Sequence, residues 1–245
     1  MNLPNAITVA RIFAAPVTAA LILMPVWQLR FVAWFLYLAA AITDYYDGKL
    51  ARSRGLVTDL GRLLDPIADK LLLACTLVPM WWLMRGVPLF SPLPPSNGWA
   101  DGSTVGLVLA DGHVALPFVT PFVLVGLPAC IIRVVLGREL LMTVFRQVAA
   151  RRGVIISAIG PAKWKTGFQS TWAGAAFFWF GAAAAAAHYR WTSGAWRALA
   201  MFNGIVGTLS MIGAVALTIY SLGLYIQRYG SVLSGAGRAK SRGPA

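Results

Sequence analysis

The chain has 245 residues, of which 58% are hydrophobic and only 12% are charged. Soluble domains carry about 25% charged residues, so this composition excludes a soluble globular enzyme, a disordered chain and a nucleic-acid-binding module. It indicates an integral membrane protein. Lys and Arg number 21 against 8 Asp and Glu, a net charge of +13, but the basic residues lie between apolar runs. There they act as topology signals and as contacts for anionic lipid head groups.

The apolar runs predict the elements of the fold in chain order. A bilayer-spanning helix needs about 20 mostly apolar residues, and six such segments are present. We therefore expect an all-α integral membrane protein, a six-transmembrane-helix bundle that forms one domain over residues 1–228. Residues 86–112 are expected to be a loop, and residues 229–245 a disordered basic tail, because they are rich in Gly, Ser, Arg and Lys. The spans are predicted near residues 6–24, 31–50, 62–84, 114–141, 164–187 and 201–226, the fourth continuing as a polar helix to Arg152.

The distribution of Lys and Arg predicts the orientation of these spans. Cytoplasmic segments of membrane proteins carry an excess of basic residues. With both termini inside, sixteen Lys and Arg residues fall in cytoplasmic segments, and four fall outside: Arg30, Arg85, Arg190 and Arg197. We therefore expect a multi-pass protein of the cell inner membrane with both termini, and the active site, on the cytoplasmic side.

The acidic residues are grouped, and this grouping predicts a site. Ionisable groups at membrane depth are costly and are functional candidates by default. Asp44 and Asp47 lie on one face of the second predicted helix, and Asp65 and Asp69 lie on one face of the third. If the two helices pack antiparallel, these four carboxylates converge, and they could not all stay ionised there without cations. Five of the eight acidic residues fall within residues 44–69: Asp44, Asp47, Asp59, Asp65 and Asp69.

The residue types select the cation and the chemistry. Carboxylate-only sites suit Mg²⁺ or Mn²⁺, whereas zinc and copper prefer His and Cys. Two such ions bridged by carboxylates can promote displacement at phosphorus. Gly48 would allow a ligand to approach the backbone closely, and the guanidinium of Arg52 could bind a phosphate. We therefore predict two divalent cations, Mg²⁺ or Mn²⁺, held by Asp44, Asp47, Asp65 and Asp69.

The full motif resembles a known signature. Its spacing is Asp44-x2-Asp47-Gly48-x2-Ala51-Arg52-x8-Gly61-x3-Asp65-x3-Asp69. Every position matches the CDP-alcohol phosphatidyltransferases, membrane enzymes that move a phosphatidyl group from a CDP-lipid to an alcohol. Residues 3–80 and 133–170 are most similar to the bacterial phosphatidylglycerophosphate synthases, although Ala162 stands where glycine is usual.

This resemblance implies substrates and residue roles. It implies transfer from CDP-diacylglycerol to glycerol 3-phosphate with release of CMP, a step of phospholipid biosynthesis, and it implies a homodimer. Asp69 would be the catalytic base that deprotonates the acceptor hydroxyl. Contacts to the CDP moiety are expected from Gly48, Arg52, Thr58, Asn5, Thr8 and Arg11, and contacts to the acceptor phosphate from Arg138, Arg146, Lys163 and Lys165.

Other functions remain open from the residues alone. Within the family the acceptor could instead be inositol phosphate, inositol, serine or phosphatidylglycerol. A cation transporter also places carboxylates in a membrane, but it needs charged groups along the whole path, and here they lie at one end. A scaffold protein with a decayed site would be expected to lack at least one position of the motif.

Overall fold

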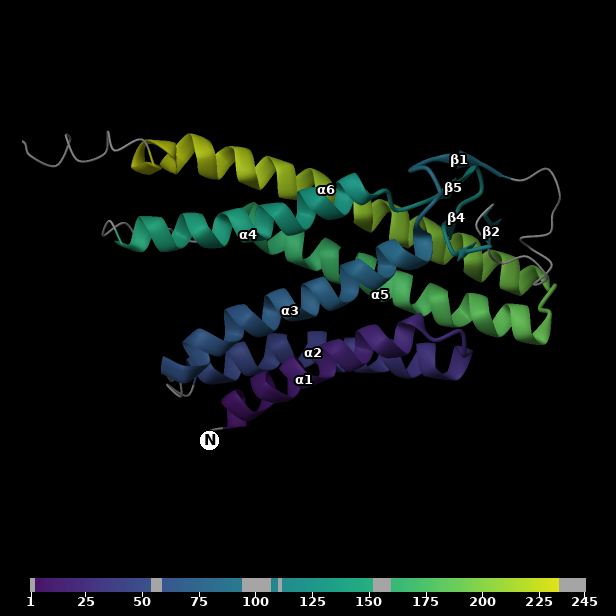
Figure 1. The fold of residues 1–245 in the computed structure, drawn as a ribbon, viewed down its shortest axis with the longest axis horizontal. Helices are drawn as coiled ribbons and strands as arrows, with labels where there is room; N and C mark the ends of the chain where they lie inside the picture. The colour runs from purple at the N-terminus through teal and green to yellow at the C-terminus, as the bar shows by residue number, and fades with distance from the viewer. Residues whose placement is uncertain (1–2, 54–58, 94–106, 110–111, 152–159, 234–245) are drawn as a thin grey trace, which may run out of the picture.

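The computed structural model describes residues 3–53, 59–93, 107–109, 112–151 and 160–233, and its side chains are described over 5–44, 64–93, 109, 112–151 and 164–227. The fold over these residues consists of six long helices and five very short strands (Figure 1). The helices are α1 (Leu3–Leu23), α2 (Trp27–Ser53), α3 (Asp59–Met84), α4 (Ala129–Arg151), α5 (Gly160–Tyr189) and α6 (Gly194–Leu233).

The six helices run back and forth along the long axis of the molecule, so the bundle has two distinct ends (Figure 1). One end holds the starts of α1, α3 and α5 and the ends of α2, α4 and α6; we call it the helix-start end. The strands lie at the opposite end, which we call the strand end. α1 packs against α2 and α3, while α5 packs against α2 and α6.

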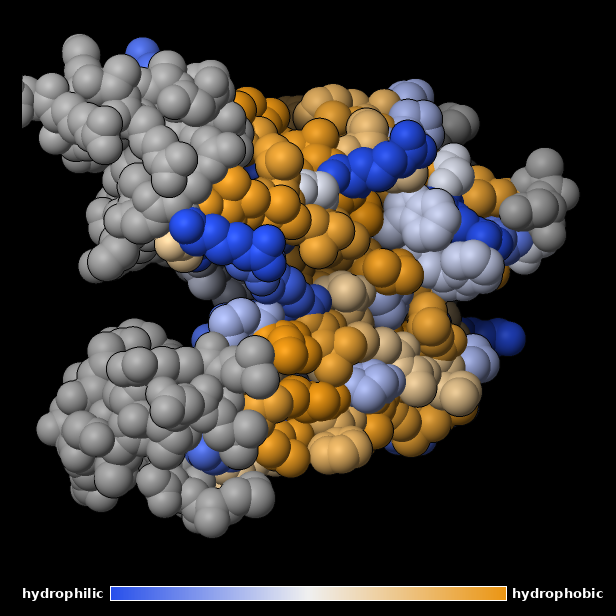
Figure 2. Space-filling view, turned by 60° about the vertical axis from the view of Figure 1, so that its left-hand side comes forward, coloured by the Kyte–Doolittle hydropathy of each residue, from blue (hydrophilic) through white to orange (hydrophobic). Residues whose placement is uncertain are grey.

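Within the part of the chain that the structure describes, three helices are long and apolar enough to cross a membrane, namely those that contain Asn5–Leu23, Leu64–Met84 and Gly194–Gln227. Large apolar side chains are also exposed on the helices, and Figure 2 shows a broad hydrophobic surface on one face of the molecule. Phe13 is 71% exposed and Phe202 66% exposed. An apolar surface of this extent marks contact with a membrane or another protein, so the fold is that of a mostly helical membrane protein.

The prediction of a helical span over residues 114–141 is wrong in its first half. Residues 114–125 form three short strands, and α4 begins only at Ala129. Pro117, Pro121 and Pro128 explain the difference, because proline removes a backbone donor and breaks a helix interior. The apolar composition of this segment could not separate buried strands from a helix. The strands are β1 (Ser91–Pro92), β2 (Leu107–Val108), β3 (Val114–Ala115), β4 (Phe118–Val119) and β5 (Val123–Val125).

The polar extension of the fourth span and the other five helices agree more closely with their predicted bounds. α4 continues to Arg151, as the polar extension predicts. α6 continues to Leu233, five residues into the segment predicted to be a disordered tail, and the rest of that segment lies outside the described residues. Two strand pairs, β1 with β5 and β2 with β3, also involve residues of the predicted 86–112 loop.

The strands are fixed to the bundle where β4 packs against two glycines of α6, Gly204 and Gly207. β4 packs against α6, and the ring of Phe118 lies over Gly207. A Cβ atom added at Gly204 would approach the carbonyl oxygen of Val119 to 1.8 Å, and one at Gly207 would approach the Phe118 ring to 2.4 Å. The backbone of the strands therefore approaches α6 closely because these two positions lack side chains.

We expect Gly204→Ala to lower the thermal stability of the protein in detergent. The new methyl group must displace the β4 backbone, and overpacking of this kind typically costs about 1–3 kcal/mol. Gly223→Ala on the same helix is the matched control, since no atom of the described residues lies within 4 Å of a Cβ there, and alanine favours a helix over glycine. Equal melting temperatures for the two variants would contradict the close packing of β4 on α6.

Candidate active site

The described aspartates lie at the helix-start end, on two helices that are both packed on α1. Asp44 lies in the second half of α2, and Asp65 and Asp69 lie one turn apart near the start of α3. The sequence predicts that α2 and α3 pack directly on each other, whereas among the described residues both of them pack on α1. The carboxylates converge because α1 joins the two helices.

The buried face of α1 supplies the side chains that join them. Asn5, Thr8 and Arg11 recur every three residues and are all at least 94% buried. Thr8 donates a hydrogen bond from Oγ1 to Oδ1 of Asp65 at 2.9 Å. Arg11 donates from one guanidinium nitrogen to Oδ1 of Asp44, and the same nitrogen lies 3.4 Å from Oδ1 of Asp69. One guanidinium nitrogen therefore holds carboxylates from two different helices.

The electrostatics of this group follow from the burial of its members. The Arg11 side chain is only 2% exposed, whereas those of Asp44 and Asp69 are 49% and 59% exposed. The cation is thus fixed within the bundle, and the two carboxylates keep one side open to solvent or a ligand. Without positive charge between them, carboxylates this close would repel one another.

We expect Arg11→Met to destabilise the protein even before any substrate is considered. Methionine keeps the apolar stem but removes both charged contacts, so the free energy of unfolding should fall by about 1–2 kcal/mol. This is less than for fully buried ion pairs because the carboxylates are half exposed. Thermal unfolding in detergent measures the change, and Arg133→Met, at an exposed position of α4, is the control. A loss no greater than that of the control would contradict the bridging role of Arg11.

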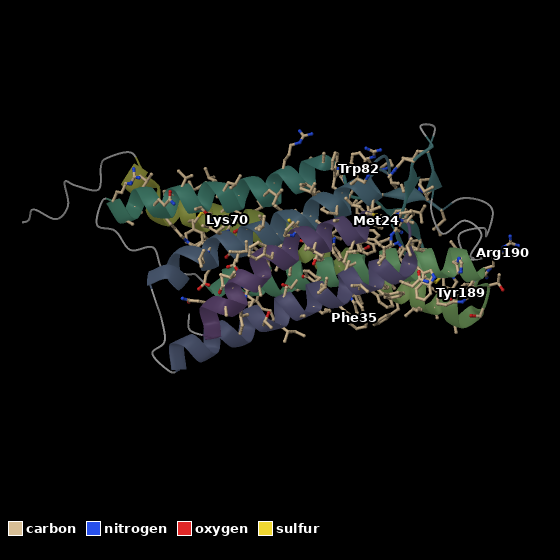
Figure 3. The ribbon with its side chains drawn as sticks, turned by 60° about the horizontal axis from the view of Figure 1, so that its bottom comes forward. Met24, Phe35, Lys70, Trp82, Tyr189 and Arg190 are labelled. Carbon is tan, nitrogen blue, oxygen red and sulfur yellow. The ribbon has the colours of Figure 1, made fainter. Side chains whose placement is uncertain are left out.

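A pocket of about 210 Å³ opens beside these aspartates and extends to helices from the other half of the chain. Figure 2 shows a hollow in the surface of the molecule, and hydrophilic side chains lie inside it. Figure 3 places Lys70, which also lines the pocket, away from Trp82, Met24 and Tyr189, which lie toward the strand end. The polar lining residues are Tyr37, Asp44, Asp69, Lys70, Thr76, Glu139, Lys165, Thr166, Gln169 and Ser170.

The far wall of the pocket carries a network of charges. Glu139 of α4 accepts hydrogen bonds on Oε1 from Lys165 of α5 and, at 2.9 Å, from Arg138. Arg138 also donates to Oγ of Ser221 on α6 at 3.0 Å. Arg138 is 6% exposed and Lys165 5% exposed. The network therefore ties α4, α5 and α6 together and sets one lysine at the pocket wall.

The predicted site residues divide into three groups. Asp44, Asp65, Asp69, Thr8 and Arg11 are brought together, and Asn5 lies one turn before Thr8 on the same buried face. Of the predicted acceptor-phosphate residues, Lys165 lines the pocket; Arg138 is not among its lining residues and contacts Glu139 and Ser221, while Arg146 is exposed on α4. The side chains of Asp47, Gly48, Arg52 and Lys163 lie outside the described residues, as does all of Thr58.

Sequence reasoning misses two residues of the pocket wall. Glu139 is not among the predicted site residues, yet it accepts a hydrogen bond from Lys165 and lines the pocket. Gln169 is not among them either, although Gln169 lies four residues after Lys165 on α5 and lines the same pocket. The i, i+4 spacing of a lysine and a glutamine is the only signal that could have pointed to it.

Comparison with known proteins extends the likeness beyond the aspartate motif. Residues 1–93 match the sequence model of the CDP-alcohol phosphatidyltransferase family. A CDP-diacylglycerol–glycerol-3-phosphate 3-phosphatidyltransferase of Rickettsia bellii is 46% identical over 77 residues, which are 31% of this chain and 42% of the relative. An Arabidopsis thaliana enzyme of the same name is 30% identical over 175 residues, 69% of this chain and 61% of the relative. A cardiolipin synthase (CMP-forming) of Oryza sativa is 31% identical over 175 residues, 70% of this chain and 44% of the relative.

These matches confirm the resemblance to the CDP-alcohol phosphatidyltransferases that the motif indicates, and the family match itself lies in residues 1–93. Within that class, several of the similar proteins carry the name CDP-diacylglycerol–glycerol-3-phosphate 3-phosphatidyltransferase, bacterial ones included. The chain spans less than two thirds of the length of the first of these relatives. The matched region contains α1, α2 and α3, which carry all the aspartates of the site.

Proposed function

We propose that this protein is a membrane enzyme that transfers a phosphatidyl group from CDP-diacylglycerol to glycerol 3-phosphate and releases CMP. One observation carries the proposal: the aspartates of α2 and α3 share a pocket with Lys165 of α5. Carboxylates that can hold a divalent cation stand on one wall, and a fixed positive charge stands on the other. A pyrophosphate donor and a phosphate-bearing acceptor need these two kinds of group side by side.

The names of the similar proteins support this choice of acceptor. Relatives from bacteria and a plant are named for glycerol 3-phosphate. The rice relative is named as a cardiolipin synthase, which would favour a lipid acceptor. The buried Lys165 favours a phosphate-bearing acceptor, because a neutral alcohol such as serine or inositol would not require a cation at the wall.

The donor set of the aspartate group fits one or two hard divalent cations. It consists of carboxylate oxygens that are half exposed toward the pocket, and Mg²⁺ and Mn²⁺ prefer such ligands. Among the described residues no three His, Cys, Asp or Glu side chains lie close enough to hold one ion, and the motif adds Asp47 to the candidates. Asp44, Asp47, Asp65 and Asp69 would hold the cations, which when bound neutralise the charge on the pyrophosphate of the donor.

The residues of the chain then perform the remaining work. Lys165 binds the phosphate of the acceptor and thereby holds its free hydroxyl group in the pocket. Asp69 takes the proton of that hydroxyl group. At the same time the oxygen of the hydroxyl group forms a bond to the phosphorus that carries diacylglycerol. The bond from this phosphorus to the phosphate oxygen of CMP breaks, and CMP leaves with the electron pair. Arg11 keeps Asp44 and Asp69 at a fixed distance during the displacement.

The location in the membrane is part of the proposal. Six spans with the helix-start end in the cytoplasm would place the aspartates where CDP-lipid head groups and glycerol 3-phosphate are found. The positive-inside rule supports this orientation, and the bacterial relatives support the inner membrane. A homodimer is proposed on the family resemblance alone.

The test uses the full chain purified in detergent with CDP-diacylglycerol and a panel of acceptors. CMP release that depends on glycerol 3-phosphate would support the proposal. CMP release with inositol phosphate instead would support the phosphate-binding role of the pocket wall and would identify a different acceptor. Release with phosphatidylglycerol, inositol or serine but not with glycerol 3-phosphate would contradict it, and cation flux into liposomes without CMP release would favour a transporter.

A further inference from the structure

Gln169 is a buried amide in the pocket for which the proposed reaction has so far no use. It lies on α5 one turn after Lys165 and is 9% exposed. It lines the pocket together with Asp69 and Lys165. Its Nε2 atom is buried and has no hydrogen-bond partner among the described residues.

An unpaired buried amide is unusual, because leaving a donor unsatisfied costs free energy. Nearby polar groups of the pocket wall do have partners. Tyr37 donates to the carbonyl oxygen of Ser170 at 3.0 Å, and Thr76 donates to the carbonyl oxygen of Leu73 at 2.9 Å. Gln169 therefore offers a hydrogen-bonding group to a ligand, whereas these neighbours are held by the protein.

The chemistry of the amide selects the group that it binds. A carboxamide has a donor and an acceptor, and the two ends are exchanged by a flip of the side chain. A hydroxyl group both donates and accepts, so it pairs with the amide in either orientation. A phosphate or carboxylate oxygen would pair only with the NH₂ end, and an ammonium only with the carbonyl end.

We propose that Gln169 binds the non-reacting hydroxyl of the acceptor and so makes the enzyme select an acceptor with a hydroxyl next to its reacting carbon. This inference rests on the proposed function. With the phosphate on Lys165 and the reacting hydroxyl at Asp69, the hydroxyl on carbon 2 of glycerol 3-phosphate is the remaining polar group. An acceptor that lacks this hydroxyl leaves Gln169 buried and unpaired, so the enzyme discriminates against it.

The experiment compares two acceptors with the purified full chain: glycerol 3-phosphate and 3-hydroxypropyl phosphate, which lacks only the hydroxyl on carbon 2. We expect the wild type to prefer glycerol 3-phosphate by more than about tenfold in kcat/KM. Gln169→Leu should bring this ratio close to one, mainly through loss of activity with glycerol 3-phosphate. The KM for CDP-diacylglycerol should stay within about twofold, since the lost contact is to the acceptor.

Two further variants keep the test decisive. Gln169→Met has similar length and flexibility, and it replaces Gln169→Leu if that protein does not fold. Thr76→Val removes another buried polar group of the wall, but one that is bonded within its own helix, so it should keep the wild-type ratio. A general loosening of the pocket would lower the ratio in Thr76→Val as well.

The outcomes separate this inference from the proposed function. A wild type that uses both acceptors equally, or variants at Gln169 that lose activity with both equally, overturns the role of Gln169 and leaves the proposed function in place. A wild type that releases no CMP with either acceptor, yet does so with another alcohol, overturns the proposed function and this inference together.

Discussion

Asp65→Asn abolishes nearly all CMP release from CDP-diacylglycerol, and Asp44→Asn does the same, if the aspartates hold divalent cations as proposed. Each change replaces an anionic oxygen ligand by a neutral amide, while the size of the side chain is almost unchanged. Loss of a residue that hydrogen-bonds a metal ligand typically lowers metal affinity or activity about 10- to 100-fold. Loss of a ligand itself should therefore lower the rate by more than about 100-fold. Initial rates of CMP release at saturating Mg²⁺ measure the effect.

The same prediction extends to removal of the metal. Excess EDTA should abolish activity, and Mg²⁺ or Mn²⁺ added back should restore it. Asp111→Asn is the control, because Asp111 lies outside the motif. This variant should keep wild-type activity. Full activity in EDTA, or an Asp65→Asn protein as active as the control, would refute the metal assignment.

A structural cause has to be separated from the loss of a ligand. Thr8 donates a hydrogen bond to Asp65, and asparagine at position 65 can still accept it through its carbonyl oxygen. Arg11 loses a charged partner when Asp44 changes but keeps Asp69. The asparagine variants should therefore unfold within a few degrees of the wild type, whereas Arg11→Met removes both contacts and should be the less stable protein.

Spacing within one helix predicts much of the site, because residues three and four apart share a face. Asp65 and Asp69 could be paired in this way, and so could Thr8 with Arg11. The contacts between helices could not be foreseen. That Arg11 bridges Asp44 and Asp69 depends on α1 packing against both α2 and α3, and no local pattern encodes which helix joins the other two.

The strand end shows a second limit of prediction from the sequence. Residues 114–125 are apolar enough to be mistaken for part of a span, and only their prolines indicate otherwise. β4 is held against α6 by the absence of side chains at Gly204 and Gly207. A glycine in a helix is compatible with many packings, so its partner becomes known only when the two segments are placed together.

Arg138 illustrates why a residue's charge does not fix its role. The family resemblance places Arg138 with Lys165 among the expected contacts to the acceptor phosphate. In the structure its guanidinium is directed to Glu139 and Ser221, and it is not among the residues that line the pocket. It is a positioning residue for Glu139, which in turn holds Lys165.

Lys165→Met should therefore raise the KM for glycerol 3-phosphate far more than the KM for CDP-diacylglycerol. Loss of a hydrogen bond to a charged group costs about 1.5–3 kcal/mol, which corresponds to roughly a ten- to hundredfold change. In the absence of the acceptor Lys165 is paired with Glu139, which also pairs with Arg138, so the acceptor phosphate must compete with a shared carboxylate. Methionine keeps the apolar stem of the lysine and leaves Glu139 bonded to Arg138.

Arg138→Met provides the contrast, because it removes a charge of the same sign from the same network without touching the pocket. We expect it to lower stability and to raise the KM for glycerol 3-phosphate by less than about threefold, since Lys165 and Glu139 remain paired. Steady-state kinetics with each substrate varied in turn separate the two variants. Equal increases for Arg138→Met and Lys165→Met would mean that the network acts as a unit. An increase in the KM for the CDP-lipid alone would place Lys165 on the donor instead, since a group that binds only one substrate changes only the affinity for that substrate.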